Sequence, residues 1–140
     1  MTTIDIADRK GRQRAIAFYV FGVWILVLLM VDMQPVRRSL FDGLWLGMTL
    51  GAAICLTPVK RWLRPGSALV RLLDDETAQE HRRMAATAGF WAAMGSALAL
   101  ALVTQFGAPV SATDVARVIA SAAIAAALLA FATLELRAAR

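Results

Sequence analysis

The residues best suited to chemistry in this chain gather in one polar stretch near its middle. Four acids and the only histidine fall within eight positions there, namely Asp74, Asp75, Glu76, Glu80 and His81. Metal ligation needs convergent side chains, but neighbours such as Glu80 and His81 point about 100° apart on a helix. The histidine alone offers a proton switch in the physiological range. We expect a solvated helix start with partner contacts, and neither a metal nor another cofactor.

Other catalytic constellations are missing from the sequence. The single cysteine, Cys55, excludes an intrachain disulfide and a multi-cysteine metal site. The only histidine lies on a separate segment from that cysteine, which disfavours nucleophilic catalysis by such a pair. The sequence also has no phosphate-binding loop and no dinucleotide-binding fingerprint. We therefore expect a protein that is not an enzyme.

The composition indicates which elements must position the polar stretch. The 140 residues are 59% hydrophobic and 18% charged, with a mean hydropathy of +0.62. Soluble domains average about 45–50% apolar and about 25% charged residues. A chain this small cannot bury so much apolar surface in one soluble core. We expect an all-α, multi-pass membrane protein whose single membrane domain covers residues 1–140.

Apolar runs between charged residues predict four transmembrane helices. The uncharged runs cover 15–31, 43–59, 84–113 and 118–134. A span needs roughly 17–25 residues, so the third run is too long for one helix, and Gly107 and Pro109 interrupt it. The predicted helices cover about 15–33, 40–57, 77–105 and 112–135.

The connections group these helices as two hairpins. Two short proline-containing turns, 34–38 and 106–110, are each followed by a Ser-x-x-Asp pattern, at 39–42 and 111–114. This pattern is typical of a capping box, which satisfies backbone N–H groups at a helix start. A longer connection at 58–83 joins the two hairpins.

Positive charge predicts the orientation in the membrane. With four spans, both tails and the 58–83 connection share one side, which carries twelve Lys and Arg residues against three on the other. The positive-inside rule then places both termini in the cytoplasm. Thirteen Arg against two Lys, with abundant Ala, suggests a GC-rich bacterium and hence its inner membrane. The basic residues flank the spans, so we expect contact with the lipid bilayer and none with nucleic acid.

Small residues at helical spacing predict the faces on which helices pack. Small side chains let two backbones approach closely within a membrane. The helix-packing candidates are Gly43, Gly47, Gly51, Gly89, Ala92, Ser96, Ala116, Ala120, Ala123 and Ala127. They either pack within the chain or, through the glycines or the fourth-helix alanines, form a homodimer interface.

No charged residue lies near the centre of a predicted span. A proton-coupled exporter of four helices needs a central acid in its first helix, whereas residues 22–25 are Gly-Val-Trp-Ile. The spans also carry too few polar residues to line a channel.

One pattern runs from the connection into the third predicted helix. It comprises Leu-Leu-Asp-Asp-Glu-Thr at 72–77, His-Arg-Arg at 81–83 and Gly-Phe-Trp at 89–91. It resembles small uncharacterised four-helix bacterial inner-membrane proteins that are often encoded beside helix-turn-helix regulators. The resemblance implies a membrane-bound regulatory partner and no catalytic residues.

These observations favour a small non-enzymatic membrane protein that acts as an interaction or regulatory partner. We expect its cytoplasmic connection to bind a cytoplasmic protein. The partner-contact candidates are Arg71, Asp74, Asp75, Glu76, Glu80 and His81. The alternative is a small dimeric transporter, or an immunity or resistance protein for an amphiphilic compound.

Overall fold

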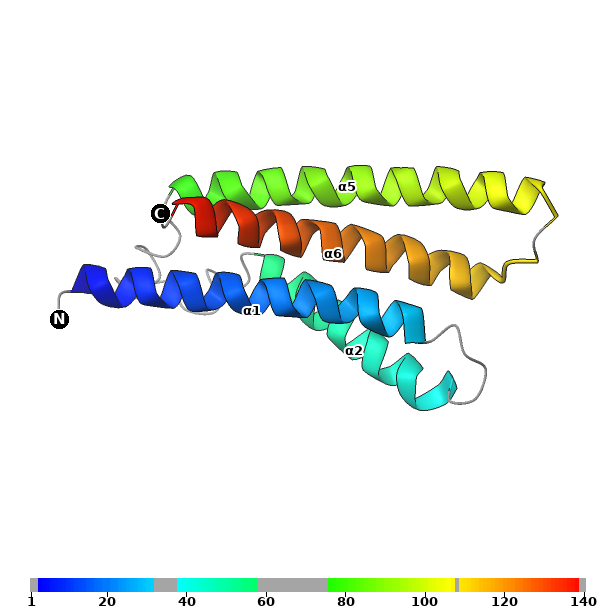
Figure 1. Ribbon diagram of the computed structural model, residues 1–140, viewed down its shortest axis with the longest axis horizontal. Coiled ribbons are helices and arrows are strands. Elements are labelled where there is room, and N and C mark those ends of the chain that lie inside the picture. The colour runs from blue at the N-terminus through cyan, green and yellow to red at the C-terminus, as the bar shows by residue number, and fades with distance from the viewer. Residues whose placement is uncertain (1–2, 32–37, 58–75, 108, 139–140) are drawn as a thin grey trace.

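The protein is all-helical over the residues that its computed structural model describes, which are 3–31, 38–57, 76–107 and 109–138. The helices are α1 (Thr3–Val31), α2 (Arg38–Leu56), α5 (Glu76–Gln105) and α6 (Ala112–Ala138). Figure 1 shows α1, α5 and α6 running side by side and α2 lying obliquely to them. The predicted all-α class and the number of helices are thereby confirmed for the described residues.

Three of the four helices are long and apolar enough to cross a membrane. The apolar segments are Gly11–Met30 in α1, Thr77–Gln105 in α5 and Ala112–Ala138 in α6, whereas α2 contributes the shorter Gly43–Leu56. A membrane location is therefore plausible on length and composition. The second span predicted from the sequence, at about 40–57, corresponds to α2 and has the shortest apolar segment.

Helix α1 begins well before the predicted start near residue 15. The helix extends back to Thr3, although its membrane-length apolar segment starts at Gly11. The prediction used the last charge before the apolar run, and this marks where a span begins, not where a helix begins. Residues 3–14 contain no proline, so nothing in the backbone stops the helix from continuing toward the N-terminus.

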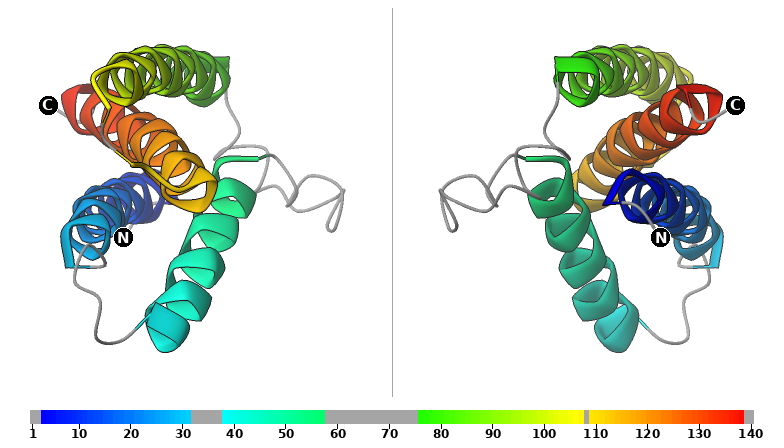
Figure 2. Two further views of the ribbon diagram at one scale, coloured as in Figure 1. Left: turned by 90° about the vertical axis from the view of Figure 1, so that its right-hand side faces the viewer. Right: turned by 90° about the vertical axis from the view of Figure 1, so that its left-hand side faces the viewer.

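Helix α6 lies between α1 and α5 and supplies much of the core (Figures 1 and 2). Its buried residues are Ser121, Ala125, Ala127, Leu128, Phe131 and Ala132. Leu128 joins Ile25 of α1 and Ala52 of α2 in one fully buried cluster. A helix that meets a neighbour on more than one side needs small residues around its circumference, which explains the alanine content of α6.

Helices α5 and α6 approach closely at Gly89. A Cβ atom at this position would lie 2.8 Å from the carbonyl oxygen of Ala123 and 3.1 Å from Cβ of Ala127. No side chain larger than hydrogen fits there without moving the α6 backbone. Fully buried Ala85 lies one turn before Gly89.

The start of α6 carries one of the two predicted caps. The backbone N–H of Asp114 donates to Ser111 Oγ at 3.1 Å, and the Ser111 hydroxyl donates to Asp114 Oδ2 at 2.7 Å. The hydroxyl acts as a capping box requires, whereas the carboxylate binds the serine side chain and not its backbone. The side chains of the other predicted cap, Ser39 and Asp42, lie outside the described residues.

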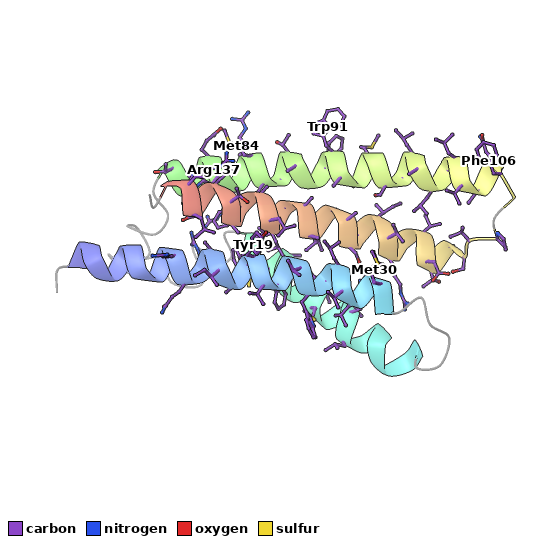
Figure 3. The ribbon with its side chains drawn as sticks, viewed as in Figure 1. Tyr19, Met30, Met84, Trp91, Phe106 and Arg137 are labelled. Carbon is purple, nitrogen blue, oxygen red and sulfur yellow. The ribbon has the colours of Figure 1, made fainter. Side chains whose placement is uncertain are left out.

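The outer surface of the bundle is strongly apolar. Only 6% of the membrane-length apolar window of α5 is buried inside the protein. Its Trp91 and Phe106 are 67% and 89% exposed, and Met30 of α1 is 77% exposed. Figure 3 shows these side chains pointing outward from the helices. Such a surface suits lipid acyl chains and would be unfavourable in water.

Candidate functional site

One end of the bundle brings together charged groups from three helices. Figure 1 places the N-terminus, the start of α5 and the C-terminus at this same end. Arg14 of α1 donates from Nη2 to Oε1 of Glu135 in α6, at 2.9 Å. The two residues are 121 positions apart in the sequence. This ion pair ties the start of the first apolar segment to the end of the last one.

His81 brings α5 into the same cluster. Its Nδ1 lies 3.8 Å from Oε1 of Glu135, the oxygen that already binds Arg14. That separation is longer than a hydrogen bond. The three side chains are shielded from solvent, with 27% of Arg14, 15% of His81 and 17% of Glu135 exposed. A single carboxylate oxygen therefore faces basic groups from both neighbouring helices.

Aromatic rings form the apolar side of the cluster. The guanidinium carbon of Arg14 lies 5.2 Å from the ring centroid of Phe131, and the Phe18 ring lies 5.5 Å from that of Phe131. Phe131 itself is 1% exposed. The cation–π contact and the surrounding rings exclude water from one side of the ion pair, which strengthens it relative to a surface pair.

Two nitrogens in the cluster are buried without a hydrogen-bond partner among the described residues. They are Nε of Arg14 and Nδ1 of His81. Glu135 has further capacity as an acceptor, because an ionised carboxylate can accept about four hydrogen bonds. The cluster thus has spare donors and acceptors within a short distance. Chemically it can hold an ion pair and form a further hydrogen bond between helices.

The described residues contain no group of three or more His, Cys, Asp or Glu side chains that could hold a metal ion. The polar stretch that first suggested ligation is only partly covered by the structure. Arg71, Asp74 and Asp75 lie outside the described residues, and so does the side chain of Glu76. Glu80 is exposed, whereas His81 lies within the cluster.

A second polar contact, a hydrogen bond, connects α2 to α6. The indole Nε1–H of Trp45 donates to Oγ of Ser121 at 2.8 Å, and Ser121 is fully buried. The guanidinium carbon of Arg117 lies 5.6 Å from the Trp45 ring centroid. The same face of α2 places Ala52 in the core with Met48 and Leu56 beside it.

The predicted helix-packing residues divide into a packed set and an open set. Gly89, Ala123 and Ala127 meet at the α5–α6 crossing. On the same two helices, Ala92, Ser96 and Ala120 are half-buried and Ala116 is exposed. By contrast, a Cβ on Gly43, Gly47 or Gly51 would have no described atom of another segment within 4 Å. The glycines of α2 therefore face away from the other helices that the structure describes.

Arg14 and Glu135 are not among the site residues predicted from the sequence. Both were counted only as charges near span ends, because nothing local links residues so far apart. A signal did exist, since Glu135 is the only acid in α6 after Asp114 and Arg14 is the last charge before the first apolar run. In a four-span arrangement with both termini on one side, these two residues lie at the same depth.

Comparison of this chain with protein-family models, with curated proteins and with solved structures finds no match. The resemblance to regulator-associated membrane proteins therefore stays a prediction from the sequence.

Proposed function

We propose that this chain is a small non-enzymatic membrane protein that acts as an interaction or regulatory partner through its 58–83 connection. The observation that carries the proposal is the Arg14–Glu135 ion pair with His81 beside it. The ion pair ties α1 to α6, and His81 lies beside it in the first turns of α5, which form the end of the 58–83 connection. A segment that must present a defined surface to a partner benefits from such an anchor.

The proposed topology has four spans in a bacterial inner membrane, arranged as two hairpins with both termini in the cytoplasm. It is supported by the excess of Lys and Arg on the tails and the connection. The clustering of both chain ends and the start of α5 at one end of the bundle also supports it (Figure 1). In this arrangement the charged cluster lies at the cytoplasmic surface.

The exposed residues at the start of α5 supply the accessible part of the proposed surface. Glu80 and Arg83 are exposed there, next to His81, which points into the bundle. Glu80 is therefore a better position than His81 for a crosslinking group, because a probe at His81 would disturb the cluster. Arg71 and Asp75 complete the set from the sequence prediction.

In-cell photocrosslinking tests this proposal. A photoreactive residue at Arg71, Asp75 or Glu80 should capture one discrete soluble protein, identified by mass spectrometry. The same residue at Thr104, exposed near the opposite end of α5, should not capture it. Serine at positions 74, 75 and 76 together should abolish capture without preventing membrane insertion. Equal capture from Thr104, or capture that survives the triple change, would contradict the proposal.

The open glycine face of α2 favours the second candidate, a dimeric transporter or an immunity protein for an amphiphile. Gly43 and Gly47 are exposed, and backbones approach closely in membranes where glycines recur every four residues. In a Cys55→Ser background, Gly47→Cys should then form a disulfide dimer on mild oxidation. Gly95→Cys on α5 is the matched control, because Gly95 is also exposed with no described atom of another segment within 4 Å of its Cβ position. Equal dimer yields from both cysteines would count against a specific α2 interface.

A further inference from the structure

One ring nitrogen of His81, Nδ1, is free to form a hydrogen bond to a neighbouring helix. Its Nδ1 is buried without a hydrogen-bond partner among the described residues and lies 3.8 Å from Oε1 of Glu135. A neutral imidazole has one N–H and one lone pair. When the lone pair is on Nδ1, it faces Oε1 of Glu135. Both atoms are then hydrogen-bond acceptors, so they repel each other and stay apart. A separation just beyond hydrogen-bond length is what such a pair would adopt.

We propose that His81 is a proton-operated latch between α5 and the α1–α6 pair. On protonation, the imidazolium Nδ1–H moves by about 1 Å and donates to Glu135 Oε1, since charge-assisted N–H···O bonds are about 2.7–2.9 Å long. The carboxylate then joins Arg14 of α1 and His81 of α5 through one oxygen. When the imidazolium loses its Nδ1 proton and keeps the proton on Nε2, only the Arg14–Glu135 bond remains, and the start of α5 is released from it.

The charged groups around His81 determine how strong the latch is. From α6, Glu135 provides the attracting negative charge. From α1, Arg14 provides a positive charge that opposes protonation but is already paired with Glu135 at 2.9 Å. On α5 itself, Glu80, Arg82 and Arg83 are the neighbouring charged residues.

The latch acts at the point where the long connection becomes α5. The helix begins at Glu76, and His81 lies within its first two turns. Formation of the His81–Glu135 hydrogen bond changes how firmly the start of α5 is held against α6. The α5–α6 crossing at Gly89 lies two turns further along the helix and stays unchanged. This change in the conformation of the chain does not require a soluble partner.

Distance measurements between spin labels test the latch in the full chain, reconstituted in lipid nanodiscs. The labels are placed at Gln13→Cys on α1 and Thr87→Cys on α5, in a Cys55→Ser background, because both positions are exposed and uncharged. Pulsed electron paramagnetic resonance is recorded at about pH 5 and about pH 8, the range in which histidine changes charge. At about pH 8, where the start of α5 is released, the distance distribution between the two labels should be broad. At about pH 5, where α5 is held, the distribution should be narrower.

Variants distinguish the latch from a general effect of acid. His81→Gln and Glu135→Gln should each give a distribution that no longer changes with pH. Glu135→Gln keeps the imidazole, so it tests the proposal even if His81→Gln does not fold. An unchanged distribution in the wild type would overturn the proposal. The same narrowing in the folded His81→Gln variant would also overturn it.

Discussion

Gly89 of α5 and Ala123 of α6 are in contact through their backbones. A Cβ atom on Gly89 would lie 2.8 Å from the carbonyl oxygen of Ala123, closer than real Cβ contacts. The close approach of these two helices at Gly89 therefore depends on the absence of a side chain there. Gly95, on the same helix, has no described atom of another segment within 4 Å of its Cβ position.

Gly89→Ala is expected to lower the free energy of unfolding by about 1–3 kcal/mol, because a rigid methyl group would push the α6 backbone away. Gly95→Ala is the matched control, with the same chemical change in open space, and should leave stability unchanged or slightly raised. Denaturant unfolding in detergent micelles, followed by circular dichroism, measures both. Equal effects of the two substitutions would show that the crossing tolerates a methyl group.

The Arg14–Glu135 pair should show a measurable coupling energy. The pair is partly buried, so its loss should cost about 1–3 kcal/mol, between the values for exposed and fully buried ion pairs. A double-mutant cycle with Arg14→Gln and Glu135→Gln isolates the interaction. Arg137→Gln, an exposed change one turn or less from Glu135 on α6, is the control. Additive single-mutant effects would mean that the two charges do not stabilise each other.

The Trp45–Ser121 hydrogen bond should contribute to the attachment of α2. Trp45→Phe removes the indole donor while keeping an aromatic ring, and Ser121→Ala removes the buried acceptor. Interhelical hydrogen bonds in membranes contribute about 0.6 kcal/mol on average and up to about 1.7 kcal/mol. The expected coupling energy in a double-mutant cycle lies in that range. A value of zero would leave the attachment of α2 to apolar packing alone.

Phe131→Ala should be among the most destabilising single changes. The ring is 1% exposed and contacts both the Phe18 ring and the Arg14 guanidinium. Its loss leaves a cavity, and substitutions of this kind cost about 3–5 kcal/mol. Phe106→Ala is the control, because Phe106 is 89% exposed. Thermal unfolding in micelles compares the two, and similar melting temperatures would argue against a packed core at Phe131.

The helices and their approximate ends could be predicted because their signals are local. The uncharged runs, the break at Gly107 and the Ser111–Asp114 cap all act within a few residues of where they occur. The one large difference, the early start of α1, arose because hydropathy reports on the membrane-facing length only. A helix can continue into water wherever no proline stops it.

The packing faces could be predicted only as a set of candidates. Gly47 and Gly89 both belong to small-residue patterns that look alike in the sequence. The structure buries Gly89 against Ala123 and leaves Gly47 open, because the buried face of α2 runs through Trp45, Met48 and Ala52 instead. Helical spacing shows which residues share a face, but it does not show which face meets a neighbour.

The sequence by itself determined that this protein is all-α with long apolar helices, since hydropathy and helix length can be read directly from the order of the residues. Only the tertiary structure brought Arg14, His81 and Glu135 to one place. Their meeting depends on how three helices align across 121 positions of chain, and no local pattern encodes that alignment. Burial of a charge requires a partner, and the partner comes from whichever helix the apolar packing brings alongside.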